Sequence, residues 1–131
     1  MNIENEMFEI AVDFLSKRYG DKADGVAVMR TENGEYLTSC WPEAPNSCVD
    51  LCAETGAICE AHKLNQKITH SICICRQKDG ENYEILPPCG VCQERLYFWG
   101  KDVKAAVTTK DNSVVFKTLS EIQPYYWLDK K

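Results

Sequence analysis

The sequence predicts a layered α/β domain in which helices pack against a mixed β-sheet. Stretches with the apolar spacing of helices alternate with short stretches of alternating or β-branched residues, and turn residues separate them. Such alternation is typical of helices layered on a sheet. No internal repeat, low-complexity stretch or linker interrupts the pattern, so residues 1–131 are expected to form one domain.

Turn residues and helix-ending residues separate the expected elements in the first half of the chain. Apolar residues recur at helical spacing up to Gly20, which ends the pattern. Asn33-Gly34 is typical of a tight hairpin turn. The expected elements are a helix over 4–19, a hairpin over 25–40, a loop over 41–50, a helix over about 51–64 and a strand over 68–75.

The second half repeats the alternation with shorter elements. Pro87-Pro88 stops regular structure, because proline has no backbone N–H. Thr118 and Glu121 fit a capping box that opens a last short helix. Between these points the expected elements are a helix over about 89–99 and strands over 103–108 and 114–116, which flank a turn at Asp111-Asn112.

Composition and charge limit the classes of partner and substrate that the protein is expected to bind. The net charge is −5 and lysines and arginines form no run, which argues against a surface for nucleic acid or for an anionic membrane. A small-molecule substrate is therefore expected. The acidic start lacks a signal-peptide pattern, and no segment approaches the ~20 apolar residues of a membrane span, so a cytoplasmic location is expected. In such a compartment eight cysteines indicate metal binding or free thiols.

Two short motifs indicate a zinc site. Cys52-Ala53-Glu54 and Pro88-Cys89-Gly90-Val91-Cys92 offer three thiolates and one carboxylate. A structural zinc ion has four protein ligands, whereas a catalytic one has three and keeps the fourth position for water. Three cysteines beside a glutamate that is not needed as a ligand therefore favour a hydrolytic zinc site.

Both motifs fall at the expected start of a helix. Cys52 and Glu54 would diverge by roughly 200° on a helix flank, so they face one ion only if it lies beyond the helix N-terminus. The ion is thus expected between two helix N-termini, whose partial positive charges offset part of the thiolate charge. Arg95, one turn after Cys92, is a candidate for a further compensating charge.

These motifs resemble the signature of the cytidine deaminase superfamily, in its small three-cysteine branch. The resemblance covers nearly the whole chain and implies a three-layer α/β/α domain with a mixed five-stranded sheet. It implies zinc bound by Cys52, Cys89 and Cys92, with Glu54 as the proton shuttle in hydrolysis of the cytosine amino group to ammonia. It also implies a homotetramer.

The resemblance is less uniform around the substrate. Members that act on cytidine typically place Asn and Glu eleven and nine residues before the first zinc cysteine to hold the ribose; here these positions are Trp41 and Glu43. The pattern is more similar to blasticidin S deaminase-like members, which carry an aromatic C-terminal tail. Glu43, Tyr125 and Trp127 are therefore the expected substrate-binding residues, for a cytosine nucleoside or a cytosine nucleoside antibiotic.

Other interpretations of the cysteines remain open. Cys48, four residues before Cys52, could close a four-cysteine structural site, which would make the protein a non-catalytic binding module. A thiol oxidoreductase would use the C-x-x-C pair alone and leave Glu54 unexplained. Cys73 and Cys75 alternate onto one face of a strand and are interpreted as small buried hydrophobic residues.

Overall fold

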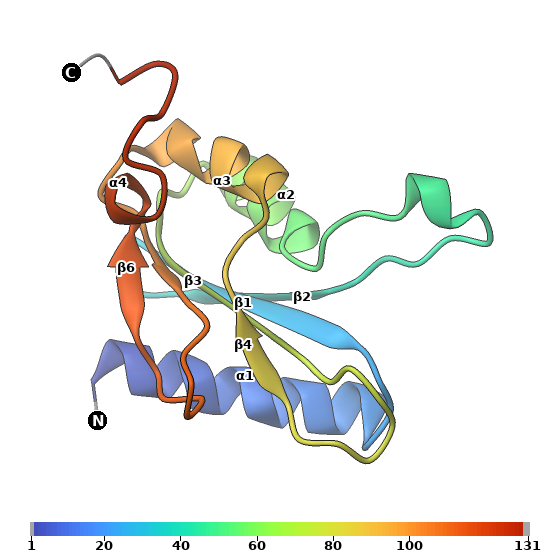
Figure 1. Cartoon of the computed structure of the whole chain (residues 1–131). Coiled ribbons are helices and arrows are strands. Elements are labelled where there is room, and N and C mark those ends of the chain that lie inside the picture. Colours follow the sequence, from blue (N-terminus) through green and yellow to red (C-terminus); the bar gives the residue numbers. More distant parts are fainter. Residues whose placement is uncertain (1, 130–131) are drawn as a thin grey trace.

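The computed structural model describes residues 2–129 as a sheet covered by helices on both faces (Figure 1). Helix α1 covers one face, and α2, α3 and α4 lie on the other. The predicted α/β fold with a mixed sheet is confirmed. The helices and 3-10 turns are α1 (Ile3–Tyr19), η1 (Ser47–Val49), α2 (Thr55–Leu64), α3 (Gly90–Leu96), η2 (Tyr97–Trp99) and α4 (Leu119–Ile122).

Within residues 2–129 the sheet has six strands, one more than the resemblance implied. They are β1 (Gly25–Thr31), β2 (Tyr36–Cys40), β3 (Ile68–Cys75), β4 (Glu84–Leu86), β5 (Lys104–Ala106) and β6 (Phe116–Thr118). Five follow the order β2-β1-β3-β5-β6, and β4 pairs with β3 beside this path. The pairing of β3 with β5 is parallel and the others are antiparallel. The additional strand is the short β4, in a segment that the sequence pattern left unassigned.

Local signals set the ends of α1 and α4. The side chain of Asn2 accepts a hydrogen bond from Asn5 N at 2.8 Å, and Gly20 closes α1 with a φ of 63°. The expected capping box of α4 is present between Thr118 and Glu121. The sequence predicts the end at Gly20 and the start at Thr118, because residues within one turn satisfy each of them, whereas the cap at Asn2 is found only in the structure.

Strand β1 divides the core into two clusters, because successive side chains point to opposite faces of a sheet. Val26 and Val28 pack with α1 on one face, whereas Met29 packs with α2 on the other. A fully buried side chain of this kind stabilises the fold by roughly 1.5–3 kcal/mol. The cluster that contains Met29 packs α2 against the sheet and so positions the segment just before that helix.

Two elements differ from the expected bounds in ways that matter for the site. Helix α2 begins at Thr55, four residues after the expected start at 51. The α-helical part of α3 ends at Leu96, and 3-10 geometry follows it.

Within residues 2–129, no helix is both long and apolar enough to cross a membrane.

Candidate metal centre and adjoining pocket

Three cysteine side chains from distant parts of the chain meet at one point. The sulfurs of Cys52, Cys89 and Cys92 all lie within 4.8 Å of one another, and the Sγ atoms of Cys52 and Cys89 are 3.3 Å apart. Zn–S bonds of about 2.3 Å in a tetrahedral site place sulfurs about 3.8 Å apart, a spacing that small movements of these side chains would reach. The donor set therefore fits zinc with three protein ligands and one open position.

The N-terminus of α3 presents two of the sulfurs. Cys89 is the N-cap residue of α3, and Cys92 lies in its first turn, where the N–H of Gln93 donates to the carbonyl of Cys89 at 2.8 Å. Proline at 88 is buried and cannot extend a strand or donate a hydrogen bond. The chain therefore leaves β4, turns at the prolines and enters α3 with both thiols on one side.

The third sulfur comes from the turn that precedes α2. Glu54 is the N-cap residue of α2, and the N–H of Thr55 donates to the carbonyl of Cys52 at 3.0 Å. The hydroxyl of Ser39 in β2 donates to the carbonyl of Ala53 at 2.6 Å, which ties the turn to the sheet. This tie holds residues 52–54 outside the helix, so the expected start at 51 is wrong.

The three thiols differ in how readily they ionise. Burial strongly raises the pKa of Cys92, and burial together with the Cys89 thiol raises that of Cys52. Burial also opposes ionisation of Cys89, but hydrogen bonds from the backbone N–H groups of Cys92 and Val91 and from the Cys52 thiol bring its pKa below the ordinary value. Cys89 at the helix start is therefore the thiol best prepared to act as a thiolate.

Glu54 is buried beside the cysteines, with 4% of its surface exposed. Burial raises its pKa, whereas a hydrogen bond that the carboxylate accepts from its own backbone N–H and the positive charge of Arg95 act in the opposite direction. Arg95 also donates a hydrogen bond to the hydroxyl of Thr55 at 3.0 Å and so links α3 to the start of α2. A carboxyl with a raised pKa is well placed to exchange protons near neutral pH.

A pocket of about 530 Å³ opens beside the cysteines. Its lining includes Cys52, Glu54 and Cys89 together with Asp24, Trp41 and Cys73. The volume lies in the range of small-molecule sites. Cys73 and Cys75, interpreted from the sequence as buried hydrophobic residues, are half-buried and line this pocket. The interpretation is therefore wrong about their surroundings.

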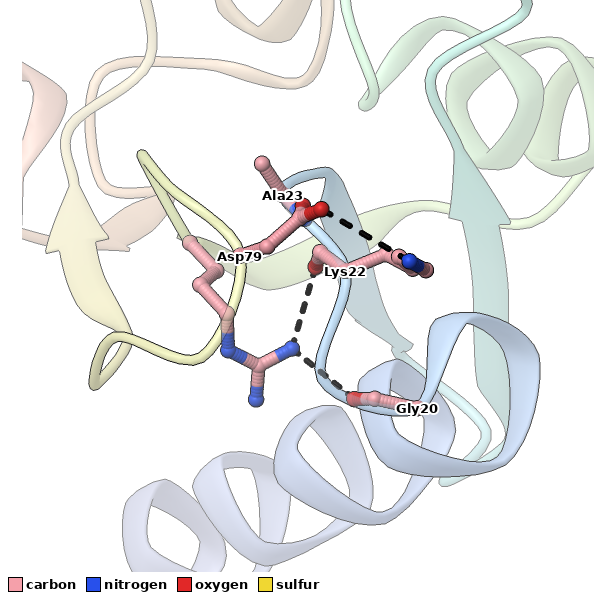
Figure 2. A network of polar contacts seen from close by, with 5 residues as sticks. Gly20, Lys22, Ala23 and Asp79 are labelled. Carbon is pink, nitrogen blue, oxygen red and sulfur yellow. Dashed lines mark hydrogen bonds and ion pairs between the residues drawn. The ribbon is translucent and has the colours of Figure 1, made fainter.

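A polar network supports the wall of the pocket that includes Ala23, Asp24 and Arg76. Arg76 donates hydrogen bonds to the carbonyls of Gly20 and Lys22 at 2.9 and 3.1 Å. Asp79 accepts from the N–H of Ala23 at 2.7 Å and lies 3.7 Å from the Lys22 ammonium (Figure 2). These contacts join the end of α1 to the loop after β3 and engage the guanidinium of Arg76.

The expected substrate-binding residues lie outside this lining. Glu43 is exposed, and the neighbouring Asp24 carboxyl, which does line the pocket, raises its pKa. Trp127 donates to Glu94 at 2.7 Å and lines a second pocket of about 560 Å³ between α2, α3 and the tail. Tyr125 is 86% exposed.

Cys48 does not join the metal cluster. It lies in η1 and is exposed, whereas the cysteines close enough to share an ion within residues 2–129 are the other three. A closed four-cysteine arrangement is therefore absent from the described part of the chain, and the open position remains.

Comparison with solved structures identifies proteins of the same architecture. The cytidine deaminase from Bacillus anthracis is 44% identical, with a TM-score of 0.93 over 96% of this chain and 90% of that chain. The cytidine deaminase from Mycobacterium leprae is 19% identical, with a TM-score of 0.72 over 95% of this chain and 99% of that chain. The cytidine deaminase from Burkholderia pseudomallei is 17% identical, with a TM-score of 0.74 over 97% of this chain and 100% of that chain.

The two more distant structures share the fold at low identity, whereas the Bacillus anthracis enzyme is similar in sequence along nearly its whole length. No protein-family model matches the chain.

Proposed function

Because this chain belongs to the cytidine deaminase family of enzymes, we propose that it is a zinc-dependent aminohydrolase that removes the amino group of cytosine in a free nucleoside or a nucleoside antibiotic. The observation that carries the proposal is the convergence of three cysteine sulfurs with the buried Glu54 at one pocket. Cytidine, deoxycytidine and blasticidin S are the substrates to compare.

The residues divide the reaction between them. Cys52, Cys89 and Cys92 would hold the zinc ion, which when bound supplies a water of lowered pKa as the nucleophile. Glu54 accepts a proton from the attacking water and delivers it to N3 of the ring. A bond forms between the water oxygen and C4; Glu54 then takes the remaining hydroxyl proton and delivers it to the exocyclic nitrogen, the bond from C4 to that nitrogen breaks, and ammonia leaves a uracil product. Burial of Glu54 supports this role, because its raised pKa lets it gain and lose a proton within one cycle.

We assign Glu43, Tyr125 and Trp127 to substrate binding on narrower grounds. Glu43 lies beside Asp24, which lines the pocket, so a substrate that reaches past Asp24 meets both carboxyl groups. Neither tail residue lines the pocket beside the cysteines, so each would act on a substrate in a neighbouring subunit. Exposed aromatic groups at Tyr125 and Trp127 support that arrangement.

A homotetramer and a cytoplasmic location complete the proposal. Large apolar side chains are exposed near α3 and the tail, among them Phe98, Trp127 and Leu128, as expected of a surface that another subunit covers. Eight free cysteines fit a reducing compartment. Light scattering coupled to size-exclusion chromatography measures the subunit number; a monomer at micromolar concentration would contradict the tetramer.

The substrate experiment uses purified zinc-loaded protein with each of the three cytosine compounds. Ammonia release in a coupled assay and the change in base absorbance are followed together, and Glu54→Gln is the matched inactive variant. We expect turnover of at least one compound by the wild type and a large loss in the variant. Zinc-loaded protein that releases ammonia from none of them would reject the substrate assignment.

A further inference from the structure

A chain of two glutamine amides links the C-terminal segment to the metal centre. The amide N–H of Gln93 donates to the carbonyl of Pro88 at 2.9 Å, and the amide of Gln123 donates to the carbonyl oxygen of Gln93 at 2.6 Å. All three residues are at least half-buried. The amide nitrogen of Gln93 thus contacts the residue before Cys89, and its amide oxygen contacts Gln123 at the end of α4.

The segment that Gln93 holds lacks two backbone hydrogen-bond donors. Pro87 and Pro88 have no backbone N–H, so neither can donate a hydrogen bond to the sheet or to α3. Strand β4 ends at Leu86, and the next regular element begins after Cys89. The amide of Gln93 therefore restrains the carbonyl that immediately precedes one proposed metal ligand.

Gln93 itself is fixed from the tail side. The hydroxyl of Tyr97 reaches the carbonyls of Leu119 and Gln123 at 3.0 and 3.1 Å. The ring of Tyr126 stacks on that of Tyr97, with centroids 3.6 Å apart and planes within 1° of parallel. These contacts dock the C-terminal segment on η2, the 3-10 turn that directly follows α3, the helix that carries Cys92.

We propose that Gln93 is a positioning residue for the metal centre, and that through it the docked C-terminal segment holds Cys89 in the geometry that retains the ion. The proposal rests on the zinc site of the proposed function. A carbonyl without this restraint lets the Pro-Pro segment and the Cys89 thiol move, so the bound ion exchanges faster. Changes to groups that orient metal ligands typically alter metal affinity by about 10- to 100-fold.

Four variants separate the two halves of this link. Gln93→Met removes both hydrogen bonds at similar volume, and Gln93→Glu keeps an acceptor for Gln123 but loses the donor to Pro88. Gln123→Met removes only the contact from the tail. Gln66→Met is the matched control, because Gln66 is also half-buried but lies beyond the far end of α2 from Cys52.

Zinc transfer to a chromophoric chelator gives the rate of metal loss, and the thiolate-to-metal absorption of the cobalt-substituted protein reports the ligand geometry. We expect zinc loss about 10-fold faster in both Gln93 variants, a smaller increase in Gln123→Met, and the wild-type rate in Gln66→Met. The cobalt spectrum should change in the Gln93 variants, while thermal unfolding of the metal-free protein changes little.

The contrary outcomes distinguish failure of the role of Gln93 from failure of the proposed zinc site on which it rests. Wild-type rates of zinc loss in Gln93→Met and Gln123→Met, with zinc bound normally, would overturn the role of Gln93 alone. Equal acceleration in Gln66→Met would overturn it too, because the effect would then be general destabilisation. A wild-type protein that binds no zinc would overturn the metal centre and this proposal with it. If Gln93→Met does not fold, Gln93→Glu and Gln123→Met still decide the question.

Discussion

Replacing Gly56 by alanine should destabilise the protein, although alanine is the better helix former. Gly56 is the second residue of α2, and a Cβ atom added there would lie 2.9 Å from the Cβ of Ser39. Ser39 cannot easily retreat, because its hydroxyl holds the carbonyl of Ala53 at 2.6 Å. The new methyl group would therefore push the start of α2 away from β2.

Two opposing terms set the size of the effect. Alanine in place of glycine inside a helix gains roughly 0.5–1 kcal/mol, whereas overpacking a close contact costs typically about 1–3 kcal/mol. We expect a net loss of about 1 kcal/mol in the free energy of unfolding, or about 4 °C in Tm for a chain of this size. Because residues 52–54 precede α2 directly, their displacement should also lower kcat.

Gly90→Ala is the matched control, since Gly90 also lies in the first turn of a helix but its added Cβ meets no atom within 4 Å. It should raise the free energy of unfolding by up to about 1 kcal/mol, through the reduced entropy of the unfolded chain. Thermal and urea unfolding of the two variants measure the difference. A Gly56→Ala protein as stable as Gly90→Ala, with wild-type kcat, would refute the close packing of α2 on β2.

Three further predictions concern the site. Glu54→Gln should lower kcat at least ~100-fold, and a normal kcat would remove Glu54 from the mechanism. In the metal-free protein at pH 8 the same change should raise the free energy of unfolding, because burial disfavours the charged carboxylate. Arg95→Met should raise the pKa of Glu54 further. Because ionised Glu54 is the active form, the acid limb of the profile of kcat/KM against pH should then move to higher pH, and Arg95→Lys should move it less. Identical profiles in the wild type and Arg95→Met would contradict the electrostatic coupling of Arg95 to Glu54. Cys52→Ser should lose zinc, measured by elemental analysis, while Cys48→Ser retains it; zinc loss in both variants would indicate a four-cysteine site.

The sequence predicts elements whose residues follow one period from end to end. The helix expected over 4–19 corresponds to α1, and the strand expected over 68–75 matches β3 at both ends. In β3, Ile72 and Ile74 pack on the α1 face, whereas a register shift opposite Arg30 and Thr31 places Ile68 in the cluster on the α2 face. The hairpin was equally predictable, because Gly34 takes the positive φ of 90° that its turn requires.

Elements defined by distant contacts were placed less well. The strand expected over 114–116 instead forms as β6 (Phe116–Thr118), because its pairing with β5 is set by partners such as Lys104 opposite Thr118. Strand β4 was missed because three residues carry too little periodicity to recognise; it exists through its pairing with the end of β3. In both cases the partner strand determines the element, and the partner is remote in sequence.

The same distinction separates the metal ligands from the pocket that they serve. A helix start fixes the relative position of Cys89 and Cys92 within four residues, so their spacing alone indicates a shared ion. The opposite wall depends on sheet register: Gly25 pairs with Cys75, and the N–H of Arg76 donates to the carbonyl of Asp24 at 2.8 Å. This pairing joins segments about fifty residues apart, and a shift of one residue would turn the side chains that now line the pocket away from it. The pair of thiols at the start of α3 is therefore encoded locally, whereas the opposite wall of the pocket depends on the register of the sheet. Variants at Asp24 and Cys75 should accordingly change the relative kcat/KM for the cytosine compounds more than the zinc content.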